Sequence, residues 1–113
     1  MPDISIDLLG DASLIEQESL AIIENGYLFG LTAWIVGGVT APGRTRVTAG
    51  VWTGASAEPL IVCTLIDDYI YPGYTPSWDG RFPLETSSGL FLTLLTADTP
   101  TVRLTGRALK NDP

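Results

Sequence analysis

The feature that most limits what this chain can form is a strict two-residue alternation close to its C-terminus. Small or apolar residues alternate there with polar ones, in the order Thr101, Val102, Arg103, Leu104, Thr105, Gly106, Arg107 and Ala108. Successive side chains of a β-strand point to opposite faces, so this alternation predicts a strand with one buried and one solvent-facing side. Residues 46–53 repeat the pattern, and only residues 12–24 leave room for a helix. The sequence therefore predicts a fold built from β-strands.

Glycine and proline divide the chain into short runs rich in Val, Ile, Leu, Thr and aromatic residues, which is strand composition. The expected strands span residues 27–36, 46–53, 60–66, 82–85, 90–95 and 101–108. Asp98 and Pro100 favour a tight turn, so the last two strands are expected to form a hairpin. About seven or eight short strands separated by polar turns indicate an all-β fold, an antiparallel β-sandwich of jelly-roll-like type.

Residues 12–24 permit two interpretations. Ser13 and Glu16 fit a helix capping box, and Asn25-Gly26 could end a helix. The same Asn25-Gly26 pair is also a strong two-residue hairpin signal. We favour a strand, because the sequence after the turn has plain strand character. No repeat or change in composition divides the chain, so residues 1–113 are expected to form one domain with an acidic N-terminal segment, residues 1–24.

The apolar phase of each alternating run predicts the interior of the sandwich. The expected core residues are Val47, Val51, Val62, Leu90, Leu92, Val102 and Leu104. Cys63 lies inside an apolar run and is expected to be a small buried residue. As the only cysteine it cannot form a disulfide within the chain, so the sequence implies no oxidative framework.

The charge distribution is acidic and uneven. The chain has 6 basic and 13 acidic residues, a net charge of −7, which argues against a nucleic-acid partner bound through bulk charge. Residues 1–43 contain no base and six acids, namely Asp3, Asp7, Asp11, Glu16, Glu18 and Glu24. These acids either form a solvated edge or face arginines of another copy in a homo-oligomer. The candidate arginines for such an interface are Arg44, Arg46, Arg103 and Arg107.

Targeting and membrane signals are absent from the sequence pattern. The N-terminus, Met1-Pro2-Asp3-Ile4, has neither a basic nor an apolar region of a secretory signal. The longest uncharged run, residues 25–43, is interrupted by glycines and a proline, and its apolar part is too short for a membrane helix of about 20 residues. We therefore expect a soluble protein without a membrane partner.

The sequence contains few of the residue types that catalysis commonly requires. The chain has no histidine, so triads that use it as a base are impossible, and the usual zinc, haem and iron–sulfur ligands are missing. Asp67 and Asp68 are neighbours on an expected strand and should point to opposite faces, so they cannot share a proton. A calcium site formed with Asp79 would lack a supporting loop motif. We expect no enzyme activity, no cofactor and no metal.

An aromatic segment, residues 67–80, is the most unusual part of the chain. It reads as a loop or irregular crossover and carries the candidate interface residues Tyr69, Tyr71, Tyr74 and Trp78. Tyrosine and tryptophan supply large contact area and are enriched at interfaces. Three interpretations stay open: a lid over the end of the sandwich, a protein–protein contact, or a platform on which sugar rings stack.

A family resemblance is carried by three stretches of the chain: residues 26–33 (GYLFGLTA), residues 82–85 (FPLE), and residues 89–94 (GLFLTL) leading into 102–108 (VRLTGRA). In these stretches, and in its Gly/Thr/Ala richness, the chain resembles small virion β-sandwich proteins of tailed bacteriophages, of the capsid decoration or tail-associated type. The resemblance implies a non-enzymatic structural role in the virion, assembled in the host cytoplasm. It carries over no functional residue.

Two classes of function follow from these observations. The first is a capsid decoration protein that forms a symmetric oligomer, for example a trimer, on the major capsid protein, with a tail or neck component as its variant. The second is a small carbohydrate-binding module that uses the aromatic loop. The mean hydropathy of +0.26 and the strands with two apolar faces favour the first, because a lone small sandwich should keep more polar outer faces.

Overall fold

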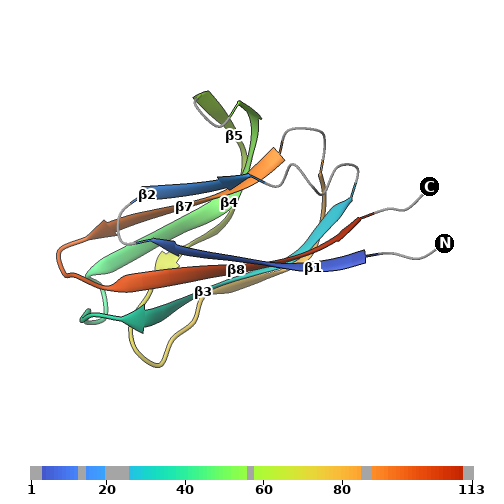
Figure 1. The fold of residues 1–113 in the computed structure, drawn as a ribbon. Helices are drawn as coiled ribbons and strands as arrows, with labels where there is room; N and C mark the ends of the chain where they lie inside the picture. Colours follow the sequence, from blue (N-terminus) through green and yellow to red (C-terminus); the bar gives the residue numbers. More distant parts are fainter. Residues whose placement is uncertain (1–3, 13–14, 20–25, 56–57, 85–87, 111–113) are drawn as a thin grey trace.

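A computed structural model of the chain describes residues 4–12, 15–19, 26–55, 58–84 and 88–110. Within these ranges the chain forms eight strands, arranged in two layers (Figure 1). In chain order the strands are β1 (Ile4–Ala12), β2 (Ile15–Ser19), β3 (Tyr27–Gly37), β4 (Thr45–Ala55), β5 (Glu58–Tyr69), β6 (Ser77–Pro83), β7 (Ser88–Thr96) and β8 (Thr101–Lys110). Among the described residues, no helix is long and apolar enough to cross a membrane.

The strands form two four-stranded sheets, with strand orders β1-β8-β3-β6 and β2-β7-β4-β5. Every pairing within them is antiparallel. Four pairs nest inside one another along the chain: β1 with β8, β2 with β7, β3 with β6, and β4 with β5. Nested antiparallel pairs of this kind arise when a long two-stranded ribbon folds over on itself into two facing sheets. The predicted all-β, antiparallel β-sandwich is therefore confirmed.

The predicted hairpin between the last two strands is wrong. β7 lies in one sheet and pairs with β2 and β4, whereas β8 lies in the other sheet between β1 and β3. The turn after β7 therefore leads the chain across the core instead of back along the same sheet. The alternation shows which face of a strand is buried but not which strand it pairs with. β7 and β8 both bury their apolar faces by facing each other across the interior.

The N-terminal region contains more strand than the sequence indicated. Residues 15–19 form β2, which confirms the strand interpretation for that part, while residues 13–14 and 20–25 lie outside the described residues. β1, residues 4–12, was not predicted as a strand. β2 and β3 belong to different sheets, so these two strands do not form a hairpin with each other. Asn25, half of the predicted turn, lies outside the described residues.

The core lies between the two sheets and confirms the apolar phase of the alternation. Val47, Val51, Leu90, Leu92, Val102 and Leu104 are all buried. The Val62 side chain lies outside the described residues. Cys63 is half-buried, so its predicted full burial is wrong. The reason is that β5 shifts register twice against β4, between Ala49 and Gly50 and between Val51 and Trp52, which breaks the two-residue period of β5.

Candidate functional site

Among the described residues, three connections pass from one sheet to the other at the same end of the sandwich. They are residues 38–44 between β3 and β4, residues 70–76 between β5 and β6, and residues 97–100 between β7 and β8. We call this end of the molecule, at the left in Figure 1, the crossover end. It contains Arg44, Tyr71 and Tyr74, with Arg46 and Tyr69 in the adjoining strand ends.

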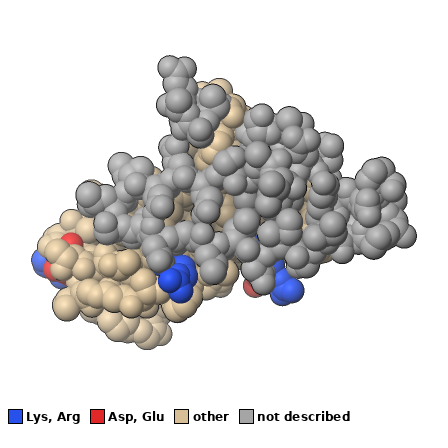
Figure 2. Space-filling model, viewed as in Figure 1, with Lys and Arg blue, Asp and Glu red and all other residues tan. Residues whose placement is uncertain are grey.

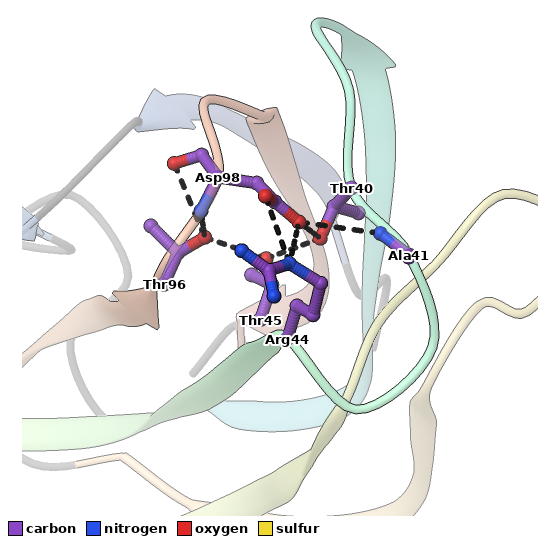
Figure 3. Close-up of polar contacts among 6 residues, drawn as sticks. All are labelled: Thr40, Ala41, Arg44, Thr45, Thr96 and Asp98. Carbon is purple, nitrogen blue, oxygen red and sulfur yellow. Dashed lines mark hydrogen bonds and ion pairs between the residues drawn. The ribbon is translucent and has the colours of Figure 1, made fainter.

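A cluster of polar side chains joins two of these connections (Figure 3). The Arg44 Nε donates to both carboxylate oxygens of Asp98, at 2.9 and 2.8 Å. Asp98 also accepts hydrogen bonds from the Thr40 hydroxyl at 3.2 Å and the Ala41 N–H at 3.3 Å. The Arg44 hydrogen bond, aided by those from Ala41 and Thr40 and opposed by burial, lowers the pKa of Asp98 from its ordinary value. We call Thr40, Arg44, Thr45, Thr96 and Asp98 the Asp98 cluster.

Threonine hydroxyls extend the Asp98 cluster into the protein. The Thr45 hydroxyl is hydrogen-bonded to those of Thr40 at 2.6 Å and Thr96 at 2.7 Å, and Thr96 accepts the Asp98 N–H at 2.9 Å. Thr40 and Thr45 are buried, so these bonds satisfy hydroxyls that water cannot reach. Nearby, Gly38 has a φ of +79°, and a Cβ there would lie 2.1 Å from the Thr99 carbonyl oxygen. The two connections are therefore in direct backbone contact.

The aromatic segment is anchored at both ends by backbone and core contacts. Ile70 is fully buried, and its N–H donates to the Thr45 carbonyl at 2.9 Å. At the other end the Pro76 carbonyl accepts the Ala33 N–H at 3.0 Å. Between them Tyr71-Pro72-Gly73-Tyr74 forms a turn closed by the Tyr74 N–H on the Tyr71 carbonyl, with Gly73 at a φ of +94°. Proline followed by a positive-φ glycine is the signature of a type II turn.

The tyrosine rings lie on the outside of this turn. Tyr71 and Tyr74 stack with ring centroids 5.4 Å apart, and the Tyr74 hydroxyl donates to the Asp68 carboxylate at 2.5 Å. That hydrogen bond, together with burial, raises the pKa of Tyr74. Tyr69 and Tyr74 are exposed and Tyr71 is half-buried. Ile70 is the residue of this segment that packs into the core, and the three tyrosine rings keep surface that is exposed to solvent.

Trp78 is separated from the tyrosines by the start of β6. The sequence placed it in the loop, but β6 begins at Ser77, so the predicted end of the loop is wrong. The strand predicted at 82–85 is confirmed at Phe82 and Pro83, where β6 ends; Leu84 lies beyond the strand, and Glu85 lies outside the described residues. Trp78 packs partly against the core cluster. Of the four aromatic residues predicted at an interface, Trp78 is thus the one with a role inside the sandwich.

Two of the four candidate arginines form ion pairs with aspartates of their own chain. Arg46 makes a two-pronged ion pair with Asp67, at 2.7 and 2.8 Å, which raises the pKa of Arg46 and lowers that of Asp67. Arg44 pairs with Asp98, as described above. The register of β1 on β8 places Asp11 opposite Arg103 and Asp7 opposite Arg107. Arg103 also lies over the Trp34 ring, 5.3 Å from its centroid. Pairing of these arginines with acids of another copy stays a prediction.

Exposed apolar side chains concentrate toward the same end. Those at or leading to it are Trp34, Val36, Val39, Tyr69, Tyr74 and Leu95. Val39 and Leu95 were not among the residues predicted at an interface. Leu95 could have been found, because it falls on the outer phase of the alternation that buries Leu90, Leu92 and Leu94. The other large exposed apolar residues among those described are Leu60 and Ile61 on β5.

The neighbouring carboxylates of Asp67 and Asp68 are bound by different groups of the chain. Asp67 is paired with Arg46, and Asp68 accepts the Tyr74 hydroxyl and the Tyr69 N–H. In the part of the chain that the structure describes, no three His, Cys, Asp or Glu side chains gather closely enough to hold a metal ion. The two neighbouring aspartates have different partners, as side chains on opposite faces of a strand should.

No protein-family model matches the sequence, and no curated protein matches it. Among solved structures, the chain is similar to one in the acidic stable capsid structure of Helicobacter pylori bacteriophage KHP30, with a TM-score of 0.58 and 9% sequence identity. The match covers 96% of this chain and 92% of that chain. At this identity the similarity shows a shared fold, and it assigns no role to any residue.

Proposed function

We propose that the protein is a non-enzymatic structural component of a bacteriophage virion, most readily a capsid decoration or stabilising protein. The observation that carries the proposal is the fold match to a chain of a phage capsid structure, which extends over 96% of this chain and 92% of the other. A match over nearly the full length of both chains compares whole sandwiches instead of one shared hairpin. Jelly-roll-like sandwiches are a common architecture of viral capsid domains.

The surface supports the same proposal. Val39 and Leu95 are large apolar side chains with exposed fractions of 74% and 73%. Tyr69, 46% exposed, and Leu95 lie on either side of Arg46 in the sheet. Exposed apolar groups that gather in one region often mark a site of protein–protein contact, and tyrosine is among the residues that dominate interface energies. We propose self-association and contact with the major capsid protein as the way this surface is used, without nucleic acid or membrane.

A carbohydrate-binding module is the second proposal, favoured by one observation: exposed tyrosines lie beside carboxylates at the crossover end. Two contacts count against it. The Tyr71 and Tyr74 rings stack on each other, and Asp68 already accepts the Tyr74 hydroxyl. A sugar would have to compete with both interactions.

The test of the virion role is immunogold electron microscopy. Antibodies raised against the purified protein are applied to purified virions of the phage that encodes it. Labelling of the head supports a decoration protein, and labelling of the tail or neck supports the variant proposal. Virions that contain no such protein by immunoblot would overturn the structural role, and binding to a glycan array would then favour the carbohydrate module.

A further inference from the structure

We draw no further inference here: the strongest candidate, the exposed apolar side chains of Val39, Tyr69 and Leu95 at the crossover end, where basic and acidic residues lie close together (Figure 2), carries no proposal because nothing in the structure shows what covers it.

Discussion

The Thr45 hydroxyl offers a direct test of how the crossover end is held together. It is fully buried and is hydrogen-bonded to two other hydroxyls, those of Thr40 and Thr96. Thr45→Val preserves the shape of the side chain and removes only these two interactions. Thr45→Ser is the matched control, since it keeps the hydroxyl and removes the methyl group.

The expected loss of stability depends on which hydrogen bonds Thr40 and Thr96 retain in the Thr45→Val variant. Leaving a buried polar group without its partner costs about 1–3 kcal/mol. Thr40 retains its bond to the Asp98 carboxylate and Thr96 retains the Asp98 N–H, so neither hydroxyl is left wholly unsatisfied. We therefore expect a loss of about 1–2 kcal/mol for Thr45→Val. With an unfolding entropy of about 2.1 cal/mol/K per residue, this lowers the melting temperature by about 4–8 °C.

The assay is thermal unfolding followed by circular dichroism at neutral pH, with urea unfolding as an independent measure. Thr45→Ser loses one buried methyl, for which about 0.5–1.5 kcal/mol is typical, and should melt above Thr45→Val. A Thr45→Val protein that melts as high as the Ser variant, or higher, would refute the reasoning. The hydroxyl chain would then fill space without stabilising the two connections.

Three further predictions follow from other parts of the structure. The pKa of Asp98 is lowered from its ordinary value of 3.8, so the stability that the Asp98 carboxylate contributes is fully present above pH 3.8 and is lost as the pH falls through the lowered pKa. When the melting temperature is followed during acid titration, it should fall less for Asp98→Asn than for the unchanged protein. Leu104→Ala removes a buried side chain and should cost about 2–5 kcal/mol, a fall of about 8–20 °C in melting temperature, and an unchanged urea midpoint would contradict the described core. Trp78→Ala should cost about 2 kcal/mol or more, because Trp78 packs partly against the core, whereas Tyr69→Ala should leave the melting temperature nearly unchanged; equal losses would mean that Tyr69 also supports the fold.

The aromatic segment illustrates how far a candidate site could be predicted from the sequence. Its composition alone marked residues 67–80 as unusual and named Tyr69, Tyr71 and Tyr74, all of which keep exposed surface. Composition could not separate Trp78 from them, because the end of the loop depends on where β6 pairs with β3. Nor could it join Asp98 to Arg44, since the two residues are 54 positions apart and meet only when both connections cross at one end.

What the sequence determined by itself is the local geometry of the strands. Alternation in residues 46–53 and 101–108 identified Val47, Val51, Val102 and Leu104 as interior residues, because the period of a strand dictates which side chains share a face. The tertiary structure decided which strands are neighbours. β7 and β8 are adjacent in sequence and yet lie in different sheets, since an apolar face is buried equally well against either layer and the choice depends on all eight strands together. The crossover end, with its paired charges and exposed apolar groups, exists only as a consequence of that choice.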